Sequence, residues 1–395
     1  MSVWIVDPID PLVFGDGRPF TAIPGGVLRS RPLPPPTALA GVVRAQLGKT
    51  DGVFDATRVT ELLKVEVYGP LVALLRDDGS VEDWLFPRPR DAAFTEDGHV
   101  RWLRPVAWPD GAQGSDHETL YPLGCEGRLG KPPALIRDLW RFSEAMSCWL
   151  THPETLPAAK ALGVDGPQPD RRVHVAIDPK TGTAKDGALF SVEGRAWIIK
   201  HGEGFRRLGF AVAVADDKPQ KQNLPKQSLH PLGGERRLAV WREHEPQPPK
   251  SPNNPKKADA DWPAQPPELL AQLKTDKGLR VILATPAEFV GGSLPQQAAP
   301  FGLQGAKLVA VANDRAEVIS GWDLQNNRPK PTRRLVPAGA VYFLDTSAVD
   351  RDALEPWLEK TWLKPVSDAP QAKLDGLGLA LVGAWDGQLD TLLTP

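Results

Sequence analysis

Clusters of arginine and lysine are the residues of this sequence whose type and spacing favour a particular chemistry. From Arg18 to Arg44 there are four arginines and no acidic residue, and 328–334 holds four bases and no acid. The stretch 171–207 holds eight bases against four acids. Guanidinium groups bind phosphate through paired hydrogen bonds, and proline-stiffened loops lose less entropy on binding. These clusters favour contact with a phosphate backbone, while solvated loops that pair with Asp or Glu remain the alternative on charge alone.

The net charge restricts this interpretation to a local surface. The 395 residues contain 47 Lys and Arg against 49 Asp and Glu, a formal charge of −2. The tail from Asp345 onward carries nine acids and four bases. The balance excludes a globally basic nucleic-acid binder, but a neutral total conceals basic loops and an acidic end.

Motifs of well-known catalytic and metal sites are absent from the sequence. It contains no Walker A loop, no His-Glu-x-x-His, no Cys-x-x-Cys and no Gly-x-Ser-x-Gly. None of the seven histidines lies three to five residues from another, and Cys125 and Cys148 are the two cysteines. We therefore predict no metal and no cofactor. Without a signal peptide or a long apolar run, we also expect a cytoplasmic protein that does not contact membranes.

Three weaker features admit two interpretations each. The pair Gly376 and Gly378 could bring backbone N–H groups close to a phosphate, or could form a tight turn. The loop Thr181–Ala184 could hold a sugar-phosphate kink, or could be an ordinary hairpin turn. His174, with Lys180 or Lys185, could serve as general acid or base in RNA cleavage, or could simply pack within a strand.

The elements that position these residues are predicted to be short strands joined by long loops. The 42 prolines and 36 glycines limit regular structure. We predict a helix over 37–47, with Thr37 as its N-cap and Gly48 ending it, and further helices over 138–150 and 352–359. Predicted strands cover 2–6, 65–75, 84–86, 173–177, 188–192, 195–200, 205–214, 237–241, 279–284, 307–312, 318–322, 340–344 and 380–385.

A proline-rich segment divides the chain. Residues 246–267 hold eight prolines in 22 positions. Such a segment cannot bury enough apolar surface to offset the entropy lost on ordering. We predict an α+β domain over 1–244 with hairpin insertions, a disordered loop or linker over 245–267, and a second α+β domain over 268–395 that ends in a glycine-rich loop and a strand.

An ordered series of segments resembles one protein family. The segments are Asp10–Phe20, Pro34–Thr37, Arg172–Asp178 with Thr181–Ala184, Leu232–Arg237, Ser320–Leu324 with Lys330–Arg334, Pro337–Phe343 and Gly376–Gly378. Together they resemble the third-subunit family of the Cmr module, RAMP proteins of type III-B CRISPR effector complexes that act in antiviral defence. The resemblance covers about residues 3 to 385.

This resemblance implies two ferredoxin-like (RRM-type) domains with antiparallel sheets and long loop and hairpin insertions. It implies a non-catalytic subunit that caps the 5′ repeat-derived tag of the CRISPR RNA and meets target RNA only indirectly. The implied protein partners are the large polymerase/cyclase-like subunit and the backbone RAMP subunit. On this basis the hairpin that carries His174 would act as a thumb between nucleotides.

The predicted RNA-contacting residues follow from the charged loops and the motifs together. They are Arg18, Arg29, Arg31, Thr37, Arg44, His174, Lys180, Thr181, Thr183, Lys185, Arg236, Arg237, Lys330, Thr332, Arg333, Arg334, Gly376 and Gly378. Two other functions stay open: a metal-independent endoribonuclease that processes CRISPR RNA precursors through His174, and a protein scaffold that binds no RNA.

Overall fold

The described residues form two compact units whose segments interleave along the sequence. The computed structural model describes all residues except 19, 21–22, 51, 109–118, 128, 131–137, 156–160, 202, 216–225, 245–260, 297, 324–327 and 392–395. Unit 1 comprises Met1–Glu82, Gly166–Lys257 and Val318–Arg333, and unit 2 comprises Asp83–Asp165, Ala258–Glu317 and Arg334–Pro395. The domains predicted over 1–244 and 268–395 are consecutive in sequence, whereas the compact units are not. Residues 83–165 belong to unit 2, and residues 318–333 belong to unit 1.

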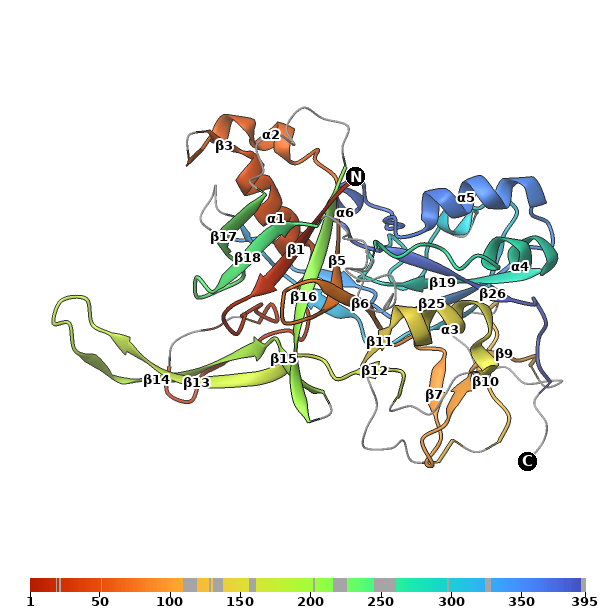
Figure 1. Ribbon diagram of the computed structural model, residues 1–395, viewed down its shortest axis with the longest axis horizontal. Helices are drawn as coiled ribbons and strands as arrows, with labels where there is room; N and C mark the ends of the chain where they lie inside the picture. The colour runs from red at the N-terminus through yellow and green to blue at the C-terminus, as the bar shows by residue number, and fades with distance from the viewer. Residues whose placement is uncertain are drawn as a thin grey trace. The chain divides into compact units, whose positions relative to one another are not determined.

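Unit 1 contains one large sheet and several short strand pairs (Figure 1). Its elements are β1 (Ser2–Pro8), β2 (Val27–Leu28), α1 (Pro36–Leu47), β3 (Lys49–Thr50), β4 (Val53–Phe54), α2 (Val59–Leu62), β5 (Val67–Leu75), β13 (Gln168–Ile177), β14 (Ala184–Ala196), β15 (Ile198–His201), β16 (Gly204–Val214), β17 (Gln227–Pro231), β18 (Leu238–Glu243), β22 (Trp322–Asp323) and β23 (Arg328–Pro329). The strands β6 (Val81–Pro87), β21 (Glu317–Ile319) and β24 (Arg333–Leu335) each cross a boundary between the two units in sequence.

The sheet of unit 1 runs in the order β5-β16-β1-β18-β17, with neighbouring strands antiparallel and β15 pairing with β16. Strand β5 is buried along its whole length, as its continuous apolar run predicts. Helix α1 packs against β5 and buries Leu39, Val43 and Leu47, the face expected from the helical spacing.

Helix α1 begins differently from the prediction. Pro35 is its N-cap and Pro36 its first residue, so Thr37 lies inside the first turn and does not cap the helix. The fixed φ of proline suits the first helical position, where a missing N–H costs nothing. The predicted end at Gly48 is confirmed: a Cβ there would lie 2.6 Å from atoms of Leu62 and Phe54.

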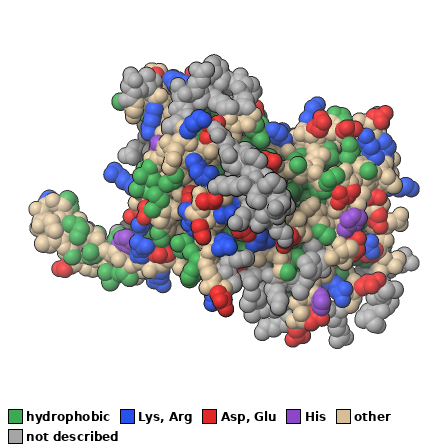
Figure 2. All heavy atoms as spheres, viewed as in Figure 1, with side chains coloured by type: hydrophobic (Ala, Val, Ile, Leu, Met, Phe, Trp, Pro, Cys, Tyr) green, Lys and Arg blue, Asp and Glu red, His purple; other side chains and the backbone are tan. Residues whose placement is uncertain are grey.

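A long antiparallel hairpin, β13–β14, extends from unit 1 as a two-stranded arm (Figure 1). Its pairing runs from Gln168 opposite Ala196 to Ile177 opposite Ala184, with a register shift between Val175 and Ile177, and β2 joins β14 in parallel. Hydrophobic side chains of this arm reach the surface in Figure 2. They include Val173, Val175, Ile177 and Leu189, which are 42–65% exposed.

Unit 2 is built on a four-stranded antiparallel sheet in the order β20-β25-β19-β26. Helices α3, α4 and α5 pack against β26. The elements of unit 2 are β7 (Ala92–Phe94), β8 (Val100–Trp102), β9 (Arg104–Pro105), β10 (Leu123–Gly124), β11 (Leu139–Arg141), the π-helical turn η2 (Phe142–Met146), α3 (Ser147–Thr151), β12 (Gly163–Val164), α4 (Leu269–Thr275), β19 (Gly278–Leu283), β20 (Lys307–Ala312), β25 (Val341–Asp345), α5 (Leu354–Thr361), α6 (Pro370–Leu374) and β26 (Ala380–Trp385). The described chain is thus an α+β protein with mostly antiparallel sheets, as predicted.

The helix predicted over 138–150 is wrong in its first part. Leu139–Arg141 form β11, which pairs with β6 on one side and β12 on the other, and helical structure starts at Phe142. The apolar residues are buried as expected, but strand pairing on both sides outweighs the helical spacing of the pattern.

The predicted linker is ordered at its C-terminal end. The carbonyl of Asp261 accepts a hydrogen bond from the Trp84 indole at 2.5 Å, and that of Pro263 accepts one from the Trp362 indole at 2.9 Å. The Trp262 ring meets Trp84 edge-on, with centroids 5.6 Å apart. The prediction of disorder is therefore wrong for 261–267, because hydrogen bonds from two tryptophans fix this part of the segment. Residues 245–260 of the predicted linker lie outside the described chain.

Candidate nucleic-acid interface

The basic loop of the N-terminal region folds back on itself in unit 1. An isolated bridge joins Gly15 to Ser30, and the Asp16 N–H donates to the Arg29 carbonyl at 3.2 Å. The N–H of Arg31 donates to the Phe14 carbonyl at 2.7 Å. These contacts place Arg18, Arg29 and Arg31 on two strands of one folded loop.

The second basic segment, Val318–Arg333, lies beside this loop. Arg31 donates from Nη1 to the Val318 carbonyl at 2.9 Å, across 287 residues of sequence. A Cβ on Gly17 would lie 3.6 Å from the backbone of Val318 and Ser320, so the two segments touch. The Ser320 hydroxyl donates to the Lys330 carbonyl at 2.9 Å. Lys330 therefore lies on a segment that contacts the loop carrying Arg18.

The arginines of these segments differ in exposure. Arg18 and Arg29 are exposed, and the Arg18 Nε lies 3.4 Å from the Asp16 carboxylate. Arg31 is half-buried, and burial lowers the pKa of its guanidinium, with Asp16 opposing this shift. Because Arg31 already bonds to Val318, its first role is to join the two segments.

The basic and hydroxyl residues at the end of the second segment differ in exposure and in the compact unit to which they belong. Lys330 and Thr332 are exposed in unit 1, and Arg333 is half-buried. Arg334 is exposed but begins the next segment of unit 2, so the structure assigns it to the other compact unit.

The turn that carries Arg236 and Arg237 packs on the N-terminal loop. The Gly234 N–H donates to the Val13 carbonyl at 2.7 Å, and Gly233 has a φ of +76°, which a residue with a side chain rarely adopts. Arg236 is exposed, whereas Arg237 is half-buried and its charge lowers the pKa of Asp170, after the larger effect of Arg172. Both arginines thus lie within the same part of unit 1 as the basic loop.

The hairpin arm carries the predicted thumb residues. The Asp178 carboxylate accepts from the Lys180 N–H at 2.8 Å, and the hydroxyls of Thr181 and Thr183 are 2.8 Å apart. These bonds shape the tip locally, and Lys180, Thr181, Thr183 and Lys185 are exposed there. The tip is therefore available to a ligand, and among the described residues of unit 1 none fixes the side chains of its lysines.

His174 lies farther down the arm, and its surroundings favour packing. Its ring stacks on Phe190 with centroids 5.6 Å apart and planes 17° from parallel, and its Nε2 is buried without a hydrogen-bond partner among the described residues. Lys185 is five strand residues from Phe190, or roughly 16 Å along β14. This separation does not favour an acid/base pair of His174 with Lys185.

Four predicted contact residues lie in helix α1 or in an internal turn, and not on the exposed basic loops. Arg44 is 7% exposed and donates to the Val65 carbonyl at 2.8 Å, so helix α1 uses it inside unit 1. Thr37 is half-buried in the first turn of α1. Gly376 and Gly378 are buried, and their N–H groups donate to the carbonyls of Lys373 and Pro286. Their positive φ values serve an internal turn, and their N–H groups are already used.

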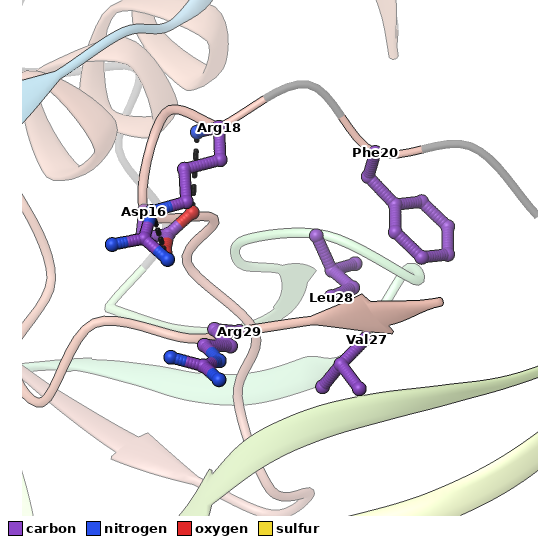
Figure 3. Close-up of a pocket in the computed structure, with 6 residues that line it drawn as sticks. All are labelled: Asp16, Arg18, Phe20, Val27, Leu28 and Arg29. Carbon is purple, nitrogen blue, oxygen red and sulfur yellow. Dashed lines mark hydrogen bonds and ion pairs between the residues drawn. The ribbon is translucent and has the colours of Figure 1, made fainter. Parts of the chain in front are cut away.

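A pocket within the basic loop contains residues that the sequence prediction missed. It has a volume of about 200 Å³ and is lined by Asp16, Arg18, Phe20, Val27, Leu28 and Arg29 (Figure 3). The Phe20 ring meets Phe190 of the arm edge-on at 5.5 Å. Phe20 could be noticed in the sequence as an aromatic residue two positions after Arg18. It lines the pocket only because β2 lies opposite it.

No metal site or membrane helix is found in the part of the chain that the structure describes. Within that part, no three His, Cys, Asp or Glu side chains gather as metal ligands would. The longest helix described, α1, has 12 residues, and none is long and apolar enough to cross a bilayer.

Comparisons with known proteins place the chain in a family. The model of the family described as CRISPR-associated protein (Cas_Cmr3) matches residues 4–385. A search of curated proteins gave no match. Among solved structures, the chain is similar to a subunit in a cryo-EM structure of the type III-B Cmr-beta complex bound to cognate target RNA and AMPPnP, with 14% identity, 86% of each chain covered and a TM-score of 0.46. A second structure of that complex with cognate target RNA gives 15% identity, the same coverage and a TM-score of 0.45. The family match spans nearly the whole chain and confirms the resemblance seen in its motifs, so the protein belongs to the Cas_Cmr3 family of CRISPR-associated proteins.

Proposed function

We propose that this protein is a non-catalytic subunit of a type III-B CRISPR effector complex, and that it binds and caps the 5′ repeat-derived tag of the CRISPR RNA. In this role it bridges the large polymerase/cyclase-like subunit and the backbone RAMP subunits, and it meets target RNA through the guide. Each unit is an elaborated ferredoxin-like domain. The order β26-β19-β25-β20 in unit 2, equal to 4-1-3-2 in chain order, supports this for the second domain.

The observation that carries the RNA-binding role is the convergence of basic residues in unit 1. Arg18, Arg29 and Lys330 are exposed on segments joined by the bond from Arg31 to Val318. Their separation in sequence means that the fold, and not local composition, brings these charges together. Exposed cations on ordered loops neutralise phosphates and release counterions from RNA.

The hairpin arm supports contact with single-stranded RNA. Its exposed tip can reach between nucleotides, and splayed bases of single strands are accessible in a way that bases in an A-form duplex are not. Arg236, Arg237, Thr332 and Arg333 extend the proposed contact surface around the basic loop.

Binding of a CRISPR RNA with and without its tag tests this function. The protein, alone and with the proposed large subunit, is titrated into labelled RNA, and the RNA is then checked on a denaturing gel. Tighter binding of tagged RNA that stays intact is expected. Equal binding of both RNAs would favour a scaffold without tag recognition. Cleavage lost in His174→Ala would make the protein a nuclease.

A further inference from the structure

Four aromatic side chains of unit 2, Trp84, Phe86, Phe142 and Trp362, follow one another in space and are called here the aromatic row. Trp84 and Phe86 are two positions apart on β6, so their side chains point to the same side of the strand. The ring centroids of Phe86 and Phe142 lie 5.6 Å apart, and those of Phe142 and Trp362 lie 6.5 Å apart. Each end of the row is an indole, and both indoles donate to residues 261–267, called here the proline segment.

The proline segment gives backbone carbonyls to the aromatic row. The Asp261 carbonyl accepts from the Trp84 indole at 2.5 Å, and the Pro263 carbonyl accepts from the Trp362 indole at 2.9 Å. Between these two residues, the Trp262 ring meets Trp84 edge-on. The segment belongs to no helix or strand, so its carbonyls are available to donors outside it.

Burial along the proline segment repeats every three residues. Pro263 and Pro266 are buried, Ala264 and Pro267 are exposed, and Gln265 is half-buried. A strand would place residues three apart on opposite faces, whereas a polyproline II helix has three residues per turn and places them on the same side. The pattern therefore indicates a polyproline II backbone that lays one side against unit 2.

We propose that the aromatic row is a recognition site for proline-rich peptides in the polyproline II conformation, and that the proline segment is its tethered ligand. Aromatic surfaces bind such peptides because the conformation is already extended and loses little entropy on binding. The site recognises the side of the ligand that carries Pro263 and Pro266, and the indoles of Trp84 and Trp362 set its register. This inference is independent of RNA binding.

The tether explains why the chain's own segment occupies the site. The proline segment leads directly into α4, which packs against α5 and β26 of the same unit. A short tether gives an effective concentration of about 1 mM. A site with an intrinsic Kd of about 100 μM would then be about 90% occupied by the segment, and an outside peptide would bind about 10-fold more weakly than to an empty site. The contact is therefore open to competition by a peptide of the same pattern.

Binding of a labelled peptide tests this inference. The double variant Pro263→Ala with Pro266→Ala, made in the full-length chain, weakens the tethered ligand and leaves the aromatic row unchanged. A fluorescein-labelled peptide with the sequence of residues 261–268 should bind this variant about 10-fold more tightly than it binds the wild type, as measured by fluorescence anisotropy. The same peptide with alanine at both proline positions should bind neither protein.

Pro267→Ala is the matched control, because Pro267 adjoins Pro266 in the chain but is exposed. This variant should bind the peptide as weakly as the wild type does. Equal peptide affinities for the double variant and the wild type would overturn the inference, since the segment would then be an ordinary part of the fold. Peptide binding by Pro267→Ala as tight as that by the double variant would overturn the assignment of the buried side as the recognised one.

The indole N–H groups of Trp84 and Trp362 give a second measurement. Their signals in ¹⁵N NMR spectra are assigned with Trp84→Phe and Trp362→Phe. Both N–H groups are hydrogen-bonded in the structure and should exchange slowly with D₂O in the wild type, but faster in the double variant. Saturating peptide should restore slow exchange in the double variant, a recovery that a misfolded protein could not show. If the peptide does not restore it, the aromatic row is not a peptide site.

Discussion

Asp91 and Arg280 form a fully buried ion pair in unit 2, and removing one partner should severely destabilise that unit. The Arg280 Nη1 lies 2.7 Å from the Asp91 carboxylate, and both side chains are 0% exposed. The other carboxylate contacts are the indole N–H groups of Trp149 at 3.0 Å and Trp102 at 3.2 Å. Arg280 also donates to the carbonyls of Ala384 at 3.0 Å and Trp149 at 2.5 Å. Every group of this network therefore depends on the others.

The size of the effect follows from what Asp91→Ala leaves behind. Burial lowers the pKa of Arg280, and Asp91 opposes that shift, so the carboxylate helps to keep the buried guanidinium charged. Without it, one cation and two indole donors lose an acceptor that water cannot replace. Breaking a buried pair in this way costs about 3–5 kcal/mol, against a typical total stability of about 5–15 kcal/mol. The double variant Asp91→Leu with Arg280→Met removes both charges and should cost less than the sum of the two single changes.

Urea unfolding followed by tryptophan fluorescence measures the loss, since Trp102 and Trp149 contact the pair. With an m value of about 2 kcal/mol per M, the midpoint should fall by about 2 M in Asp91→Ala. Glu355→Ala is the control, because Glu355 pairs with Lys274 at 2.8 Å in the same unit but is 52% exposed. Exposed pairs contribute at most about 1 kcal/mol. Equal urea midpoints for the two variants would refute the argument that burial, and not the N–O distance, determines how much an ion pair contributes to stability.

Three further changes test the other unit. Lys330→Ala should flatten the dependence of log Kd for tagged RNA on log salt by about 0.7, because one phosphate contact is lost; an unchanged slope in a filter-binding series would place Lys330 outside the interface. Gly233→Ala should lower the melting temperature more than Gly182→Ala: both glycines have positive φ, but a Cβ at 233 would lie 2.4 Å from the Val13 carbonyl, whereas nothing lies within 4 Å at 182. Equal losses in calorimetry would show that the close contact relaxes. Burial, followed by the charge of Lys49, lowers the pKa of His230 below its ordinary value of 6.5. As the pH drops through 6.5, the histidine therefore binds a proton more readily in the unfolded chain than in the folded one, and the free energy of unfolding should decrease. His230→Gln should fall less between pH 7.5 and 5.5, and identical pH profiles would contradict this.

The sequence predicted most strands well, because their signals are local. The runs 208–214 and 380–385 contain no charged side chain, and the strands β16 and β26 observed there begin and end within one residue of the predicted 205–214 and 380–385. The prediction failed at Leu139–Arg141, where pairing on both sides of β11 decided between strand and helix. It also failed at 261–267, because the proline content indicated disorder and gave no sign that backbone carbonyls there accept hydrogen bonds from two distant tryptophans.

For the candidate site, charge alone could not separate surface from interior. Arg18 and Arg44 belong to one acid-free cluster, yet the first is exposed and the second, in the last turn of helix α1, is 7% exposed. Gly376 and Gly378 matched a phosphate-loop pattern, but their N–H groups are used by an internal turn. Phe20 ends the family segment Asp10–Phe20, and its place in the pocket depends on β2 and on the Phe190 ring, which lie against it.

The sequence by itself determined the α+β class, the absence of familiar catalytic motifs, the basic loops and the order of motifs that marks the family, since all of these depend on residues close together in the chain. The tertiary structure decided which distant segments meet. It brought Val318 to Arg31, assigned 83–165 and 318–333 to different units, and formed the pocket at β2. Burial and hydrogen bonding depend on such long-range contacts, so the chemical role of each arginine could be assigned only once its neighbours in space were known.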